Sequence, residues 1–263
     1  MLTKYIKIGL LFLLGVAALS AQADPWQGFI IKNRTVGNQA NYRLLQFDNS
    51  QTQQTVTINV VQLNNNSYSA EIVDQKPFFD FLSFKRVYET TRENNAFLGV
   101  NGGYFTPNNT PLGLVILNGK RISSLSSSNL LSGLLLIDNQ GQVKLVWSKT
   151  TYQQARYALQ AGPFLIQPNG NFVLKTSNQI SRRTAVALTD NSLLIISSSP
   201  VSLYNLGHFL VNYPNLFGAD KINTALNLDG GSSAAMTVFF PNHNPLIIPE
   251  ILPVRNALIF RLH

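Results

Sequence analysis

The 263-residue sequence contains no cysteine, only three histidines and few charged residues, which make up 12% of the chain. Without cysteine the chain forms no disulfide, has no thiol nucleophile and cannot bind a metal through thiolates. The histidines, His208, His243 and His263, are scattered, so no pair has the spacing of a zinc site. These absences exclude thiol enzymes and the common zinc-dependent classes.

The sequence also lacks the short motifs of several large enzyme classes. It has no Gly-x-Ser-x-Gly elbow, no P-loop and no dinucleotide-binding fingerprint. The net charge is +8, yet the basic residues form isolated pairs: Lys85-Arg86, Lys120-Arg121 and Arg182-Arg183. Nucleic-acid binding would need a basic stripe with interleaved aromatic residues, so we predict no nucleic-acid partner. The charge instead fits an anionic ligand, or solubility near an anionic envelope surface.

The first 23 residues have the pattern of a secretory signal peptide. Lys4 and Lys7 precede an apolar run over residues 8–18, and Ala21-Gln22-Ala23 supplies a cleavage site before Asp24. The alternative is a membrane anchor, but the run is shorter than the roughly 20 apolar residues that span a bilayer. We therefore expect a periplasmic or secreted protein with no membrane anchor after cleavage. Nothing in the sequence indicates the oligomeric state.

Residues 24–263 predict one α+β domain with mixed, mostly antiparallel sheets flanked by a few helices. Alternating and β-branched runs separated by turn signals predict the strands. These strands cover residues 29–47, 55–63, 96–100, 112–117, 120–123, 133–137, 142–147, 159–167, 184–189, 192–197, 222–228, 234–240 and 254–262. Apolar residues at helical spacing predict helices over 80–95, around 150–157, and from an N-cap at Ser202 to Tyr213.

Two segments share a design in which an apolar strand runs into a Gly-Gly turn. Residues 225–228 lead into Asp229, which is followed by Gly230, Gly231, Ser232 and Ser233. Such a turn presents a carboxylate beside bare backbone N–H groups and hydroxyls, as in sites for sugars and phosphates. The simpler interpretation is an Asp-Gly hairpin turn.

A second segment has the same pattern, which argues against interpreting both segments as chance hairpin turns. It runs from Phe97 through Asn101, Gly102 and Gly103 to Tyr104. Asp229 is also the only acidic residue of the expected mature chain that is both embedded in apolar sequence and followed by a glycine turn. The others are expected in polar turns, on a helix face, on the outer face of a strand, in loops or at the terminus. It is therefore the leading candidate for a catalytic carboxylate, with a structural role in the turn as the alternative.

Two further features are ambiguous when taken alone. Arg183 and Thr184 open an apolar strand, where an arginine can bind phosphate through two hydrogen bonds or simply discourage strand pairing. Gly162-Pro163 interrupts an apolar run, which indicates a bulge or a close backbone approach. We predict no cofactor and no metal. Asp229, Asn101 and backbone carbonyls have oxygen atoms of the kind that bind a hard cation, so that alternative stays open.

The order of these motifs resembles that of the phosphodiester glycosidase family. The resemblance covers roughly residues 84–262 and rests on the joint order of its segments, each of which is weak alone. The segments are NGGYF at 101–105, PLGLVILNGK at 111–120, AGPFL at 161–165, RTAVAL at 183–188 and ALNLDGGSS at 225–233.

The resemblance implies an enzyme that removes a sugar, N-acetylglucosamine among them, from a sugar-1-phosphate diester. Its site would contain three catalytic residues, Asp229, Arg183 and Asn101. The substrate-binding residues would be Gly102, Gly103, Tyr104, Gly162, Pro163, Thr184, Gly230, Gly231, Ser232 and Ser233. Ser232 stands where the family frequently has glycine, and Tyr104 where phenylalanine is frequent.

The chemistry would explain how one carboxylate suffices. Ordinary glycosidases need a second carboxylic acid to protonate a poor leaving group. A phosphate monoester, with a second pKa of about 6, leaves far more readily. Two alternatives stay open: cleavage of the P–O bond in the same substrates, and a non-catalytic envelope protein that binds glycan or phosphate. The expected partner in each case is a glycosyl phosphodiester or a phosphorylated envelope glycan.

Overall fold

A computed structural model describes residues 24–37, 39–75, 85–152 and 154–263. The predicted signal peptide, residues 1–23, therefore lies outside the described residues. The described residues are mostly β, with two α-helices, α1 (Val87–Glu93) and α2 (Leu203–Asn212), and two short 3₁₀ turns, η2 (Pro214–Phe217) and η3 (Gly231–Ser233). Within the described ranges no helix is long and apolar enough to cross a membrane.

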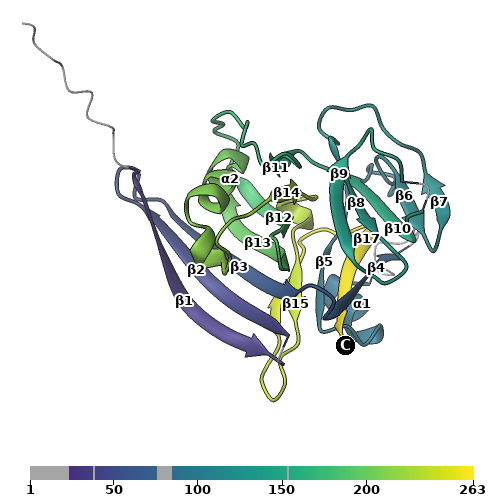
Figure 1. The fold of residues 1–263 in the computed structure, drawn as a ribbon, viewed down its shortest axis with the longest axis horizontal. Coiled ribbons are helices and arrows are strands. Elements are labelled where there is room, and N and C mark those ends of the chain that lie inside the picture. The colour runs from purple at the N-terminus through teal and green to yellow at the C-terminus, as the bar shows by residue number, and fades with distance from the viewer. Residues whose placement is uncertain (1–23, 38, 76–84, 153) are drawn as a thin grey trace, which may run out of the picture.

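The strands of the described residues form three sheets (Figure 1). In order of neighbours, the seven-stranded sheet contains β1 (Trp26–Val36), β2 (Ala40–Asn49), β3 (Thr55–Asn64), β13 (Ser192–Val201), β12 (Ser181–Leu188), β14 (Thr224–Asn227) and β11 (Phe164–Ile166). One five-stranded sheet, the β8 sheet, contains β7 (Lys120–Ser123), β6 (Val115–Leu117), β10 (Tyr157–Ala161), β8 (Gly133–Ile137) and β9 (Val143–Trp147). The other, the β5 sheet, contains β16 (Leu246–Ile248), β15 (Met236–Val238), β5 (Leu98–Asn101), β17 (Asn256–Leu262) and β4 (Tyr68–Asp74).

Strand pairing is antiparallel throughout the part of the chain that the structure describes. The prediction of mostly antiparallel sheets with few helices is thus confirmed, but mixed sheets are not seen there. Many successive strands are joined by short turns and pair directly, as antiparallel hairpins do. Where a helix intervenes, α1 between β4 and β5 and α2 between β13 and β14, another strand separates the two flanking strands in the sheet.

The three sheets contribute to a common hydrophobic core. Leu63 of the seven-stranded sheet, Leu159 of the β8 sheet and Leu258 of the β5 sheet belong to one buried cluster. Helix α2 packs on the seven-stranded sheet, where Phe209 stacks on Phe47 with ring centroids 4.0 Å apart. Figure 1 shows this sheet on the left with β1 and β2 at its edge, and the β8 sheet on the right. The motif-bearing strands β12 and β14 of the seven-stranded sheet lie near β9 of the β8 sheet.

The local sequence signals locate most turns correctly. The hairpins over 112–123 and 133–147 are confirmed, and Asn118 and Gly119 both have positive φ, as the two-residue turn requires. The hairpin across Asp190-Asn191 is also confirmed. Helix α2 begins where predicted, because the Ser202 hydroxyl oxygen accepts a hydrogen bond from the Asn205 N–H at 3.1 Å.

Three predictions of elements are corrected. Residues 29–47 form two strands, β1 and β2, because the chain reverses after Gly37, which has a φ of 62°. The helix predicted around 150–157 does not form in residues 150–152 and 154–157, because the N–H of Arg156 bonds instead to Ile137 O (2.9 Å) and β10 begins at Tyr157. Helix α1 is shorter than predicted over 85–95, and residues 80–84 lie outside the described ranges.

Candidate functional site

The predicted site residues lie where the three sheets meet. Asn101 ends β5, Arg183 lies near the start of β12, and Asp229 follows β14 by two residues. Gly162 and Pro163 connect β10 in the β8 sheet to β11 in the seven-stranded sheet. Because these are the points at which the chain enters or leaves a sheet, motifs distant in sequence are brought together there.

Asn101 is fully buried and links the two Gly-Gly segments. Its Nδ2 donates to the backbone carbonyl of Asp229 at 2.8 Å. Its Oδ1 accepts from the Thr184 hydroxyl at 2.6 Å and from the Ala235 N–H at 3.0 Å. The Asp229 N–H in turn donates to Gly102 O at 3.2 Å. Both ends of the Asn101 amide are thus used to hold the chain around Asp229, so the geometry favours a positioning role for Asn101.

Asp229 is partly exposed and hydrogen-bonded by its own turn. Its Oδ1 accepts from the Gly230 N–H at 2.8 Å. Burial raises the pKa of the Asp229 carboxyl above its ordinary value of 3.8, and hydrogen bonds from the Ser233 hydroxyl and the Gly230 N–H act in the opposite direction. The carboxylate is therefore held in one orientation and only partly shielded from water.

The residues after Asp229 are fixed by contacts with two other segments. Gly230 lies against β12, since a Cβ atom there would be 2.7 Å from Arg182 O. Gly231 has a φ of 62° and begins η3. The carbonyl of Ser232 accepts from the Ile251 N–H at 2.7 Å. The turn that carries the carboxylate is thus anchored on both sides.

Tyr104 joins the first Gly-Gly segment to the Gly162 turn. Its hydroxyl donates to Gly162 O at 2.7 Å and accepts from Asn227 Nδ2 at 2.9 Å. Burial raises the Tyr104 pKa, the charge of Asp229 raises it further, and the charge of Arg183 lowers it. Tyr104 therefore stays a neutral hydrogen-bonding group within electrostatic range of both charged residues.

Asn227 is a site residue that the sequence analysis did not single out. It is 2% exposed, and its Nδ2 donates to Gly162 O (3.1 Å) and Leu228 O (2.6 Å) as well as to Tyr104. It connects three of the predicted motifs. The available signal was its place two residues before Asp229 in a strand with alternating faces.

Asn256 is a second such residue, and it holds the first Gly-Gly turn. Its Oδ1 accepts from the Gly103 N–H at 2.9 Å, and its carbonyl accepts from the Gly102 N–H at 2.9 Å. A Cβ atom at Gly102 would lie 1.9 Å from the Asn256 Oδ1. Gly102 therefore serves close packing on β17, while a Cβ atom at Gly103 would lie 2.9 Å from the Leu159 side chain of β10. Local sequence could not reveal a partner 153 residues away.

Arg183 is a buried cation without a carboxylate partner among the described residues. It is 8% exposed, and its guanidinium donates to Val201 O at 3.0 Å and Gln179 O at 2.8 Å. Burial lowers the Arg183 pKa. A buried positive charge that no carboxylate of the described residues neutralises favours the approach of an anion.

The Gly162-Pro163 turn bridges the site and the loop before β8. Its peptide bond is cis, and the Pro163 carbonyl accepts from the Asn227 N–H at 3.1 Å. Gly162 has a φ of 151°, and a Cβ atom there would lie 2.2 Å from Leu130 O. The close approach expected at this interruption is confirmed, and only glycine fits it.

Three other acidic residues have structural partners. Asp74 forms a two-point ion pair with Arg255, with distances of 2.7 and 2.8 Å. Glu71 pairs with Arg261 at 2.9 Å. Glu250, expected in a loop, is 3% exposed, and its Oε1 accepts the first backbone N–H of α1 at 2.9 Å. These contacts leave Asp229 as the acid that the Gly-Gly turns present.

No group of three or more His, Cys, Asp and Glu side chains that could hold a metal occurs in the described ranges. A hard cation would have to be bound by Asp229 together with backbone carbonyls. The absence of a cofactor and of a metal therefore stays a prediction.

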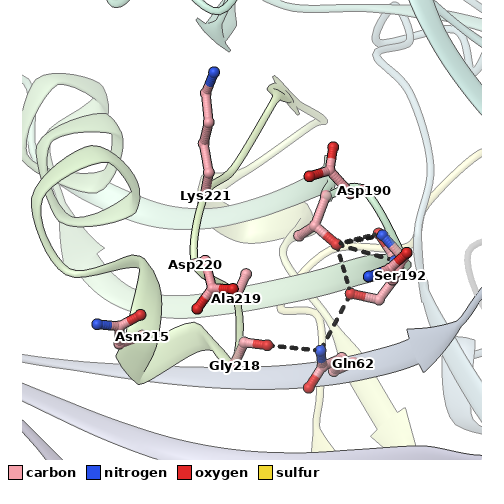
Figure 2. Close-up of a pocket in the computed structure, with 10 residues that line it drawn as sticks. Gln62, Asp190, Ser192, Asn215, Gly218, Ala219, Asp220 and Lys221 are labelled. Atoms are coloured by element: carbon pink, nitrogen blue, oxygen red, sulfur yellow. Dashed lines mark hydrogen bonds between the residues drawn. The ribbon is translucent and has the colours of Figure 1, made fainter.

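A polar hollow of about 330 Å³ lies at the opposite end of β14 from Asp229 (Figure 2). Gln62 Nε2 donates there to Ser192 Oγ at 3.1 Å and to Gly218 O at 2.8 Å. Asp190 accepts from Asn223 Nδ2 at 2.7 Å. The hollow contains none of the predicted site residues, and these polar groups bond to one another.

Comparison with known proteins agrees with the resemblance read from the motifs. The family model described as phosphodiester glycosidase matches residues 94–261. No curated protein sequence matches the chain.

Solved structures that share the fold include one bacterial and one animal protein. A hypothetical protein from Synechocystis is 15% identical with a TM-score of 0.64, and the match covers 88% of this chain and 64% of that one. This chain therefore spans somewhat less than two thirds of the Synechocystis protein. The zebrafish N-acetylglucosamine-1-phosphodiester alpha-N-acetylglucosaminidase catalytic domain, auto-inhibited by its pro-peptide, is 17% identical with a TM-score of 0.62. That match covers 91% of this chain and 89% of the zebrafish chain.

Proposed function

Because this chain belongs to the phosphodiester glycosidase family, we propose that it is an exported hydrolase that removes a sugar from a sugar-1-phosphate diester. The bond cleaved is the glycosidic C–O bond. N-acetylglucosamine is the first sugar to test, because the zebrafish enzyme with the same fold is named as an N-acetylglucosamine-1-phosphodiester alpha-N-acetylglucosaminidase. The partner is a glycosyl phosphodiester or a phosphorylated envelope glycan.

The observation that carries the proposal is the pairing of one presented acid with one buried cation. Asp229 projects from a Gly-Gly turn that Asn101 fixes, and Arg183 lies near enough for both charges to act on Tyr104. The Gly230 N–H donates to the Asp229 carboxylate at 2.8 Å. An anionic leaving group and a developing sugar cation need these two charges.

The proposed reaction uses Asp229 against the developing charge at the anomeric carbon. The C1–O bond breaks, and its electron pair leaves with the phosphate oxygen. Asp229 attacks C1 or stabilises the oxocarbenium ion. Water then supplies the hydroxyl of the free sugar, and its other proton goes to the released phosphate monoester or to solvent. No second carboxylic acid is needed, because the phosphate monoester leaves as an anion that Arg183 attracts.

The proposed location, periplasmic or secreted, rests on the sequence of residues 1–23. Asp24, the first residue of the proposed mature chain, accepts hydrogen bonds from the Trp26 N–H at 3.1 Å and the Tyr213 hydroxyl at 2.9 Å. Both bonds use side-chain oxygens of Asp24, so they persist after cleavage at that point. A secreted or periplasmic form that begins at another residue would contradict the site of cleavage.

The test is a hydrolysis assay with purified residues 24–263. UDP-N-acetylglucosamine, other UDP-sugars and aryl or alkyl sugar-1-phosphodiesters are supplied, and released free sugar is measured. We expect release by the native protein and a loss of at least about 100-fold in Asp229→Asn, since a group that acts on the transition state is removed. Circular dichroism and thermal melting show whether the variant is folded.

Two outcomes separate the alternatives. Near-full hydrolysis by folded Asp229→Asn would remove the acid from the mechanism. Tight binding of glycosyl phosphodiesters without turnover by the native protein would instead support a non-catalytic binding protein.

A further inference from the structure

A cavity of about 950 Å³ lies between the loop before β8 and the end of β9. Its volume is within the range of small-molecule and cofactor sites. The lining is rich in hydroxyl groups and includes one aromatic and one cationic side chain. It consists of Leu125, Ser126, Ser127, Ser128, Asn129, Ser132, Trp147, Ser148, Lys149 and Thr150.

The loop that forms one wall of this cavity is held in place by a buried glutamine. Gln160 of β10 has no exposed surface, and its Oε1 accepts from the backbone N–H groups of Leu114 (3.0 Å) and Ser126 (2.8 Å). Its Nε2 donates to the carbonyls of Ser126 and Leu131, both at 2.8 Å. The serine-rich wall is thus preorganised, which lowers the entropic cost of binding a ligand.

Trp147 supplies the aromatic surface of the cavity. It ends β9, is 38% exposed, and packs against Phe164 with ring centroids 4.9 Å apart at an interplanar angle of 68°. The contact with Phe164 holds the indole while part of it stays open. A fixed aromatic ring beside several hydroxyls and an amide suits the apolar face and polar edge of a pyranose.

The cavity borders the candidate active site through the Gly162 turn. Ser132, which lines the cavity, accepts the Phe164 N–H through its Oγ at 3.3 Å, and the Leu130 carbonyl packs on Gly162. The Gly162 carbonyl accepts from Tyr104 on the side of the candidate site. Figure 1 shows β9 beside β11 and β14, the strand that leads to Asp229. One turn therefore contacts both places.

We propose that this cavity is a second carbohydrate-binding site, which holds a pyranose unit of the glycan whose phosphodiester is cleaved at Asp229. The indole of Trp147 stacks on the sugar ring, and the serine hydroxyls, Asn129 and Lys149 bind its hydroxyl groups. The proposal deepens the proposed function and rests on it for the identity of the substrate. Binding of free sugar at the cavity does not require turnover.

The test measures the binding of chitotriose and maltotriose, each up to about 50 mM, to residues 24–263. Trp26 and Trp147 are the only tryptophans, and Trp26 is 6% exposed, so a saturable change in tryptophan emission reports on Trp147. We expect at least one of these sugars to bind with a Kd of about 1 mM or tighter. No change in emission with either sugar would overturn the proposal.

Variants locate the site, with saturation-transfer NMR as the readout because it needs no tryptophan. Trp147→Ala is expected to raise Kd at least about tenfold, while Trp147→Phe keeps an aromatic face and stays within about threefold. Phe29→Ala, which removes another exposed aromatic residue outside the cavity, is the matched control and is expected to bind normally. Unchanged binding by Trp147→Ala, or equal loss in Phe29→Ala, contradicts the proposal. Hydrolysis is assayed separately, so its absence counts against the proposed function and not against this site.

Discussion

At the scale of single residues, the environment of Asp229 predicts how activity depends on pH. Burial raises the pKa of this carboxyl above 3.8, and the proposed reaction needs its ionised form. As pH falls through the raised pKa the carboxylate is protonated, so kcat/KM is expected to fall at a higher pH than for an ordinary aspartate. A pH–rate profile of the folded enzyme measures this. A profile that stays flat down to about pH 4 would contradict the role of Asp229.

The same shift predicts that Asp229 lowers the stability of the folded protein at neutral pH. A carboxyl whose folded pKa is raised favours folding at low pH, and this contribution is lost as pH rises through the folded pKa. Asp229→Asn removes the charge, so its Tm is expected to equal or exceed that of the native protein at about pH 7. The Tm difference between variant and native protein is expected to become less favourable to the variant at about pH 3, where the native carboxyl is protonated. Thermal melts at the two pH values measure this difference. A variant Tm that is lower than the native Tm at about pH 7 would refute this account, whatever the result at about pH 3.

Substitution of Tyr104 is expected to affect the stability of the protein more than its hydrolytic activity. Tyr104→Phe removes the hydroxyl that bonds to Gly162 O and Asn227, yet Asn227 still donates to that carbonyl. We expect a loss of about 1 kcal/mol in the free energy of unfolding. Hydrolysis is expected to stay within about threefold, because the aromatic ring at position 104 is kept. Denaturant unfolding and the hydrolysis assay measure the two effects; Tyr104→Ala, which also removes the ring, is expected to impair both.

At the scale of elements, the turn between β10 and β11 is closely packed against a neighbouring loop. It passes from the β8 sheet to the seven-stranded sheet, and a Cβ at Gly162 would lie 2.2 Å from Leu130 O. Gly162→Ala is therefore expected to destabilise the protein by more than about 2 kcal/mol and to reduce hydrolysis.

Gly170 offers a matched control for this substitution. It also has a positive φ, of 82°, but a Cβ atom there meets nothing within 4 Å. Gly170→Ala carries the backbone strain without the clash, so it is expected to cost about 1 kcal/mol and to leave hydrolysis unchanged. Chemical denaturation of both variants measures the difference. Equal losses would show that the close approach to Leu130 is unimportant.

The same scale shows which elements could be predicted from sequence. The sequence predicts the hairpins at Asn118-Gly119 and Asp190-Asn191 and the helix capped by Ser202. These are local structures, and the residues that specify them lie within a few positions of one another. Residues 159–167 form two strands that belong to different sheets. The sequence shows the interruption at Gly162, but it does not show which strands β10 and β11 pair with. The helix expected around 150–157 fails for the same reason, since tertiary pairing with β8 overrides a weak local pattern.

At the scale of the whole molecule, the site depends on how three sheets meet. The order of the Gly-Gly, Gly-Pro and arginine motifs is visible in the sequence and agrees with the match to the family model. Asn227 and Asn256, which bond these segments together, have no distinguishing local pattern. Their importance arises from hydrogen bonds that cross between strands far apart in the chain, such as that from the Gly103 N–H to Asn256 Oδ1.

The central claim is that the chain cleaves the C–O bond of a glycosyl phosphodiester. Hydrolysis in ¹⁸O-labelled water, followed by mass spectrometry of both products, tests it most directly. The account predicts that the label enters the anomeric hydroxyl of the released sugar and that the phosphate monoester stays unlabelled. Label in the phosphate would show cleavage of the P–O bond and contradict the account.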